Sequence, residues 1–239
     1  MASTTTSGRP GHRGRIERIH DHAPEVRSLF IRCVGAPIPA FAPGMFISIA
    51  IPLASEARVR PYTIASRPEA GDPFELVFNR VPGGVGSEWL FGLGVGDEFD
   101  FTGPFGAFVL DRAPSSPTIF IAEGTGIAPI RPMLYRALAA DATYPVELLY
   151  FAERGEHLLY RDELDELARR YPHFRVETRV CPEGLWRAAA EEVGRRWIDG
   201  DGDRSRHFYI CGVGAGVIEL RDQLRAAGYE RRSVHYEKW

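Results

Sequence analysis

The chain has two parts with different patterns of apolar and polar residues. Up to about residue 104, apolar residues come in short runs rich in β-branched and aromatic side chains, and turns containing Pro and Gly separate them. None of these runs keeps a helical period over about 12 residues. Six short strands at this spacing indicate a small antiparallel barrel. The pattern places them at 15–22, 26–34, 45–52, 59–66, 73–81 and 95–104.

From residue 118 onward, near-continuous apolar runs alternate with amphipathic stretches. This alternation predicts a parallel sheet of five strands with helices on both faces. In the second helix, Tyr160, Leu164, Leu167 and Tyr171 share one face. The strands are expected at 118–123, 146–152, 174–180, 207–212 and 233–237, and the helices at 127–141, 158–171, 187–198 and 215–228.

The polar, Pro-containing stretch 111–117 separates the two parts of the chain. The expected fold is therefore a two-domain β + α/β protein. A disordered tail (1–12) precedes a six-stranded antiparallel β-barrel (13–112), and a five-stranded parallel Rossmann-like domain (113–239) follows.

Composition narrows the function classes. A net charge of −3 disfavours nucleic-acid binding, and no apolar run approaches the ~20 residues of a membrane span. Cys33, Cys181 and Cys211 are too few for a four-cysteine iron–sulfur cluster, and their spacing implies no disulfide framework. We therefore expect a cytoplasmic chain without a metal.

The fourth predicted strand carries Arg60-Pro61-Tyr62-Thr63. A guanidinium can hold a pyrophosphate, and Tyr62, on the same face, can stack on a flat ring. Twenty residues later, Gly83, Gly84 and Gly86 permit close approach of a ligand, and Ser87 is expected to cap a short helix. The simpler alternatives are an exposed polar strand face and a Gly-rich hairpin turn.

In the α/β half, Glu123-Gly124-Thr125-Gly126-Ile127 joins a strand to a helix, where open α/β sheets bind ligands. Cys211-Gly212 ends another strand. A cysteine there can also be a small buried hydrophobe.

Together these motifs resemble the ferredoxin–NADP reductase superfamily over about residues 13–239. The resemblance implies FAD, NADPH or NADH, and a separate electron acceptor. It assigns the FAD pyrophosphate to Arg60, Gly84, Val85, Gly86 and Ser87, the flavin face to Tyr62, flavin N5 to Thr63, and the ribityl and adenine side to Phe78, Asn79 and Arg80.

The resemblance also places the nicotinamide nucleotide along Gly124, Thr125, Gly126, Ile127, Cys211 and Gly212. It implies that Trp239 covers the flavin and that Glu237 assists proton transfer. Thr63, Cys211, Glu237 and Trp239 would then meet at one ring. Family members usually have Gly or Thr where this chain has Glu123, so we expect no direct phosphate contact from that side chain.

The choice of nicotinamide nucleotide depends on cations for the 2′-phosphate. Arg154 follows the second strand of the α/β half, Arg179 ends the third, and Tyr160 can stack on adenine. These residues favour NADPH over NADH.

We therefore expect an NAD(P)H-dependent flavoprotein reductase that delivers electrons to a small redox protein such as ferredoxin or flavodoxin. One alternative is an NADH-using reductase component of an oxygenase, or a flavin or ferric reductase. The non-enzymatic alternative is a flavin-binding sensor or scaffold subunit.

Overall fold

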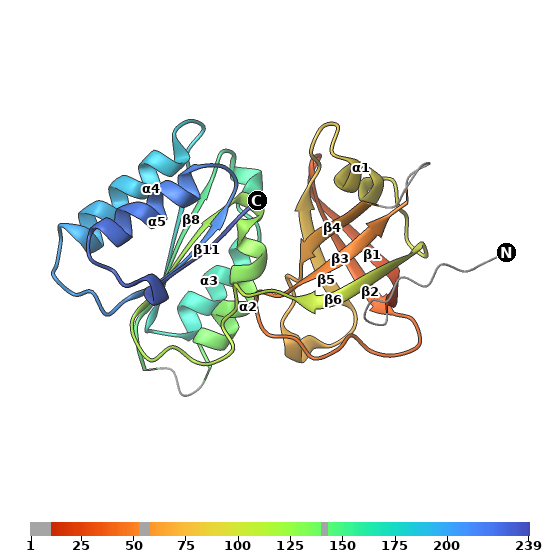
Figure 1. The fold of residues 1–239 in the computed structure, drawn as a ribbon, viewed down its shortest axis with the longest axis horizontal. Coiled ribbons are helices and arrows are strands. Elements are labelled where there is room, and N and C mark those ends of the chain that lie inside the picture. The colour runs from red at the N-terminus through yellow and green to blue at the C-terminus, as the bar shows by residue number, and fades with distance from the viewer. Residues whose placement is uncertain (1–10, 53–57, 140–142) are drawn as a thin grey trace.

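The structure, a computed structural model, describes residues 11–52, 58–139 and 143–239. It contains a six-stranded antiparallel sheet and a five-stranded parallel sheet in two adjoining lobes (Figure 1), which confirms the predicted fold class. Most of the expected tail, residues 1–10, lies outside the described residues, and His12 already begins the first strand. Within the described ranges, the helices are too short or too polar to cross a membrane.

The first lobe is the predicted barrel. Its strands follow the order β4-β3-β6-β1-β2-β5. A bridge between Ile64 and Leu76 joins the end of β4 to β5, so the two edge strands meet. The strands are β1 (His12–Ala23), β2 (Val26–Cys33), β3 (Phe46–Ile51), β4 (Arg58–Thr63), β5 (Phe74–Asn79) and β6 (Glu98–Phe105).

Alternation of apolar and polar positions fixes which face of each barrel strand is buried. In β3, Ile47, Ile49 and Ile51 are fully buried, whereas the residues between them are partly exposed. The short helix α1 (Val85–Phe91) adds Leu90 to the same core.

The second lobe is the predicted parallel sheet, in the order β11-β10-β7-β8-β9. Helices α2 and α3 cover one face, and α4 and α5 cover the other (Figure 1). The strands are β7 (Thr118–Glu123), β8 (Val146–Ala152), β9 (Phe174–Val180), β10 (His207–Gly212) and β11 (Val234–Lys238), and the helices are α2 (Ile127–Ala137), α3 (Arg161–Arg170), α4 (Leu185–Val193) and α5 (Gly216–Ala226).

Two predicted helix boundaries are wrong. Tyr160 precedes α3 with a φ of 58°, a left-handed conformation that non-glycine residues rarely adopt. The helix expected at 187–198 begins earlier, at Leu185, and ends in a π-helical turn at Gly194–Ile198. The end of the helix expected at 127–141 lies partly outside the described residues, and α2 itself ends at Ala137.

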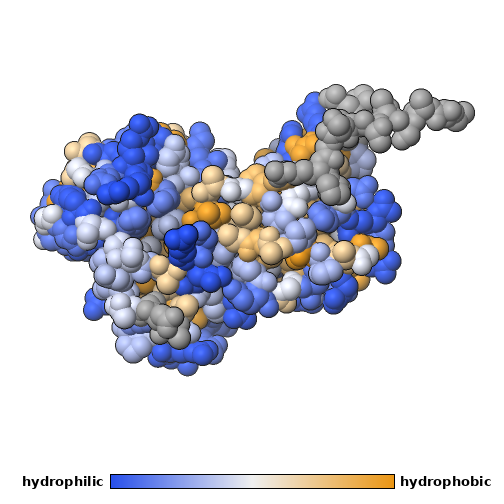
Figure 2. Space-filling view, turned by 60° about the horizontal axis from the view of Figure 1, so that its bottom comes forward, coloured by the Kyte–Doolittle hydropathy of each residue, from blue (hydrophilic) through white to orange (hydrophobic). Residues whose placement is uncertain are grey.

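The two lobes share a hydrophobic cluster. Ala65, Val77 and Phe108 of the first lobe pack with buried residues of β7, β10 and α2. On the face shown in Figure 2, apolar surface gathers where the lobes meet. A polar contact reinforces this interface, because Arg131 of α2 donates to Glu75 of β5 at 2.8 Å and to the Ala65 carbonyl at 3.1 Å.

Parallel pairing brings three carboxyl ends of strands together. Cys211 on β10 pairs with Ala122 on β7 and with Glu237 on β11. Open α/β sheets bind ligands at such an edge, and here this edge carries the predicted nucleotide motif.

Candidate functional site

Arg60, Tyr62 and the turn before α1 lie in contact, as their predicted joint role requires. A Cβ built on Gly86 would lie 2.6 Å from the Tyr62 hydroxyl oxygen and 3.0 Å from Arg60 Cγ. A larger residue at position 86 would therefore displace the side chain of Tyr62 or Arg60. Burial raises the pKa of Tyr62 to about 12, so its ring stays neutral.

Ser87 stabilises this turn from inside the helix and does not cap it. The N-cap of α1 is Gly84, so the predicted cap role of Ser87 is wrong. The Ser87 Oγ accepts a hydrogen bond from the Val81 amide at 2.9 Å and donates to a carbonyl of the same turn. The hydroxyl holds the shape of the turn, and Gly86 is the residue that faces Arg60 and Tyr62.

The three candidates at the end of β5, namely Phe78, Asn79 and the following Arg80, have different surroundings. Phe78 meets the Tyr62 ring edge-on at a centroid distance of 5.4 Å. Asn79 lines a pocket between the lobes. Arg80 is ion-paired with Glu88 of α1 at 2.6 Å, so its charge already has a partner on the protein.

The turn from β7 into α2 is packed against β10. Residues 124–126 form a 3-10 turn that leads directly into α2, and Gly124 has a positive φ of 52°. A Cβ on Gly126 would lie 2.3 Å from the Cys211 carbonyl oxygen. Glycine at 126 is therefore required for the turn to approach β10.

Glu123 points across the edge of the sheet. Its Oε2 accepts a hydrogen bond from the Val213 amide at 2.8 Å. Burial is the main cause that raises the pKa of its carboxyl, and the bond from Val213 opposes that shift. Glu123, for which no direct phosphate contact is expected, lines the pocket between the lobes.

Cys211 and Glu237 lie side by side on β10 and β11, Cys211 fully buried and Glu237 partly buried. Burial raises the pKa of the Cys211 thiol well above its usual range, and nearby Glu237 adds to the shift. Burial also raises the pKa of Glu237. Among the described residues, the buried Oε2 of Glu237 has no hydrogen-bond partner, so it is available to a ligand.

Thr63 and Trp239 belong to different lobes. Thr63 ends β4 and is 7% exposed. The Trp239 amide donates to the Gly212 carbonyl at 3.0 Å, and Figure 1 shows the C-terminus on the side of its lobe that faces the barrel. The meeting of these two residues with Cys211 and Glu237 at one ring remains a prediction.

A pocket of about 320 Å³ has walls from both lobes. Trp186 of α4 also lines it and was missed from the sequence. Its Nε1 donates to the Val213 carbonyl at 2.9 Å, and its ring lies where side chains on Gly212 and Gly216 would be. A tryptophan directly after Gly184-Leu185 was the available signal. The lining residues are Val26, Asn79, Glu123, Gly124, Thr125, Glu153, His157, Leu159, Trp186 and Val213.

The residues predicted to recognise the adenosine end already have protein partners. Arg179 contacts Glu177 and Glu192, the latter at 3.0 Å. The Tyr160 hydroxyl donates to Glu75 at 2.8 Å, and Arg131 lies 4.2 Å above the Tyr160 ring. Tyr160 thus contributes to the contact between the lobes, and its stacking on adenine stays a prediction.

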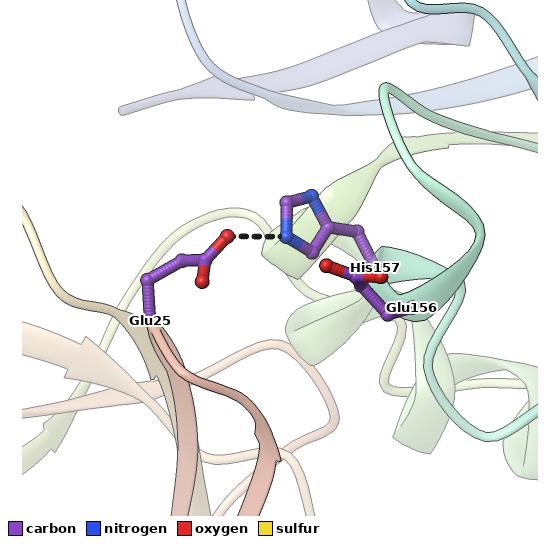
Figure 3. Close-up of side chains that lie close together, drawn as sticks. All are labelled: Glu25, Glu156 and His157. Carbon is purple, nitrogen blue, oxygen red and sulfur yellow. Dashed lines mark hydrogen bonds and ion pairs between the residues drawn. The ribbon is translucent and has the colours of Figure 1, made fainter.

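Arg154 belongs to a charged cluster that includes His157, a residue of the pocket wall. Glu25 in the β1–β2 turn and Glu156 and His157 beyond β8 bring potential metal-ligand atoms within 4.8 Å of one another (Figure 3). His157 Nε2 lies 2.8 Å from Glu25 Oε1. Arg154 is ion-paired with Glu25 and lies 3.4 Å from Glu156, so a guanidinium already supplies the positive charge. We assign this cluster to contact between the lobes.

The site fits FAD and a nicotinamide nucleotide. Arg60 offers a guanidinium for pyrophosphate, and the missing side chain of Gly86 lets the start of α1 pack directly against Arg60 and Tyr62. On the other lobe, the free carboxylate oxygen of Glu237 and the turn at 124–126 lie at the same edge of the sheet.

Comparisons with known proteins agree with this geometry. Residues 37–110 match an oxidoreductase FAD-binding domain, and residues 120–219 match an oxidoreductase NAD-binding domain. A ferredoxin–NADP reductase B of Sorangium cellulosum is 33% identical over 94% of this chain and 96% of that protein.

Oxygenase reductases are also similar. The electron transfer component of toluate 1,2-dioxygenase from Pseudomonas putida is 26% identical, over 96% of this chain and 68% of that protein. The crystal structure of an Amycolatopsis cytochrome P450 reductase superposes with a TM-score of 0.82 at 26% identity, covering 99% of this chain and 73% of that one.

Proposed function

The chain belongs to the ferredoxin–NADP reductase family and is an FAD-dependent NAD(P)H oxidoreductase, and from this premise we propose how its residues divide the work. Arg60, Tyr62 and the 84–87 turn hold FAD. The nucleotide binds along 124–127 and Cys211. NADPH is the preferred reductant, and the electrons leave to a separate small redox protein such as ferredoxin or flavodoxin.

The pocket shared by the two lobes is the observation that supports this proposal most. Asn79 comes from the strand next to Tyr62, and Gly124 and Thr125 come from the nucleotide turn. The shared hydrophobic cluster and the Arg131–Glu75 bond hold the two lobes in this relation. A nucleotide and a flavin bound to these segments would therefore lie next to each other.

Bound FAD supplies the hydride acceptor and the means to pass electrons on singly or as a pair. The chain's own residues position the flavin and the nicotinamide and exclude water from them. The Tyr62 ring offers a stacking face, and the buried Thr63 hydroxyl can donate to a ring nitrogen. The buried Cys211 thiol stays protonated and excludes water beside the nicotinamide. Glu237, with its raised pKa, can hold a proton at Oε2.

Arg179 carries the proposed preference for NADPH, with Arg154 assisting. The 2′-phosphate would take the place of the carboxylates that now contact Arg179. Arg179→Ala should raise the KM for NADPH about 10-fold and leave that for NADH nearly unchanged. Arg195→Ala removes another cation from the same ion-pair network and is the control. Equal losses with both nucleotides in Arg179→Ala, or a wild type that prefers NADH, would refute the assignment.

Trp239 is proposed to cover the flavin face that the nicotinamide needs. Trp239→Ala keeps the backbone bonds to Gly212 and Gly214 but removes the indole. Because the indole and the nicotinamide ring would compete for the same flavin face, losing the indole should tighten nicotinamide-nucleotide binding by up to ~10-fold. It should also lower kcat and KM together.

The control is Tyr236→Ala, which removes an exposed aromatic side chain of β11 that is bonded to Arg221. It should leave nucleotide affinity unchanged. If Trp239 only fills a hydrophobic gap between the two domains, Trp239→Ala will lower the melting temperature without changing nucleotide affinity. Binding titrations and thermal melts of both variants distinguish the two roles.

An oxygenase is the alternative destination for the electrons. The similarity to the toluate dioxygenase component favours it, although that protein is longer than this chain. Reduction rates with purified ferredoxin, flavodoxin and an oxygenase component compare these acceptors directly.

A further inference from the structure

Glu123 lies where two ligand-facing segments meet. It ends β7, immediately before the turn into α2, and its carboxylate reaches the loop that leads from β10 into α5. A Cβ on Gly212 would lie 2.8 Å from Glu123 Cβ and 2.9 Å from its Oε2. The missing side chain of Gly212 therefore makes the space that the carboxylate fills, and the Val213 amide is its partner.

This arrangement opposes the charge of the proposed ligand. Glu123 shares the pocket of about 320 Å³ with Gly124, Thr125 and Val213, the segments along which the nucleotide would run. A pyrophosphate there would meet an ionised carboxylate within a few ångströms, at a cost on the order of 10- to 100-fold in affinity. Protonation of the carboxylate removes this repulsion.

We propose that Glu123 sets the affinity and pH dependence of the nucleotide site. Its carboxylate holds the Val213 amide in the nucleotide-free protein and takes up a proton when the pyrophosphate of NADPH or NADH enters. This inference rests on the proposed function, because it requires the nucleotide to bind in this pocket.

The charged neighbours determine the sign of the effect. Burial raises the pKa of Glu123, and Glu153 beyond β8 raises it further, whereas the Val213 amide and His157 lower it. Buried Cys211 and Tyr150 also face this carboxylate and stay neutral. An incoming pyrophosphate raises the pKa again. Binding is therefore strongest at low pH and weakens as pH rises through the pKa of Glu123 in the complex.

Glu123→Gln tests this proposal with little change of shape. The glutamine oxygen can still accept from the Val213 amide, but the side chain carries no charge and takes up no proton. Nucleotide affinity at about pH 8 should rise on the order of 10-fold. Glu153→Gln is the matched control, because Glu153 lines the same pocket without that bond. It should have a smaller effect on affinity and keep the proton uptake.

The measurement is titration calorimetry of the FAD-loaded protein with NAD⁺ and NADP⁺, in two buffers of different ionisation enthalpy, from about pH 6 to about pH 8. Wild type should take up as much as one proton with the better-bound nucleotide, and Glu123→Gln close to none. Proton uptake that persists in Glu123→Gln, or weaker binding by that variant, overturns the inference and leaves the proposed site intact. If neither nucleotide binds to wild type, the proposed nucleotide site fails and the inference fails with it.

Discussion

Arg131→Met should destabilise the protein by about 3–5 kcal/mol, because it leaves a buried carboxylate without its cation. Glu75 is 3% exposed and accepts a hydrogen bond from Arg131 at 2.8 Å. Ser28 and Tyr160 also donate to Glu75, but neither carries a positive charge. Urea unfolding followed by circular dichroism measures the loss.

Arg136→Met is the matched control, on the same helix. Arg136 pairs at 3.0 Å with Glu69, whose side chain is 65% exposed, and such a pair contributes at most about 1 kcal/mol. The double variant Arg131→Met/Glu75→Gln should recover much of the lost stability, since Glu75 then carries no charge and Glu163, the other partner of Arg131, has a 24% exposed side chain and keeps its bond from Tyr135. Equal small effects of Arg131→Met and Arg136→Met would show that the interface does not depend on the buried pair.

Arg60→Ala should weaken FAD binding about 10–100-fold. A charge-assisted bond to phosphate is worth about 1.5–3 kcal/mol. Arg60 lies against Gly86, at the turn proposed to hold the same pyrophosphate, and the substitution leaves the buried part of β4 in place. Titration of apoprotein with FAD, followed by flavin fluorescence, gives the dissociation constant.

Arg13→Ala removes an exposed arginine of β1, paired with Asp100, and should leave FAD affinity unchanged. An Arg60→Ala protein that binds FAD as tightly as wild type would contradict the assignment of the pyrophosphate to this strand.

Local patterns were sufficient to predict the fold. Alternation in β3 and continuous apolar runs such as β7 depend only on which faces are covered. The contact of Arg60 and Tyr62 with Gly86 also followed from short motifs, because a guanidinium, an aromatic ring and bare backbone suit one kind of ligand.

The errors arose where contacts between distant segments decided the outcome. Tyr160 continues the apolar face of α3 in the sequence, but Glu75 and Arg131, far away in the chain, hold it in the interface. Ser87 fits the cap pattern, yet its hydroxyl bonds back to Val81. The partner of Glu123 is Val213, 90 residues later, and no local pattern reveals that pairing.

The most direct test of the central claim is anaerobic mixing of the purified, FAD-loaded protein with NADPH and with NADH. We expect rapid loss of the yellow flavin absorbance, and a faster loss with NADPH than with NADH. The colour should return when an acceptor such as ferredoxin is added. A protein that binds FAD but keeps its full absorbance in the presence of both nucleotides would contradict the claim that this chain brings nucleotide and flavin together.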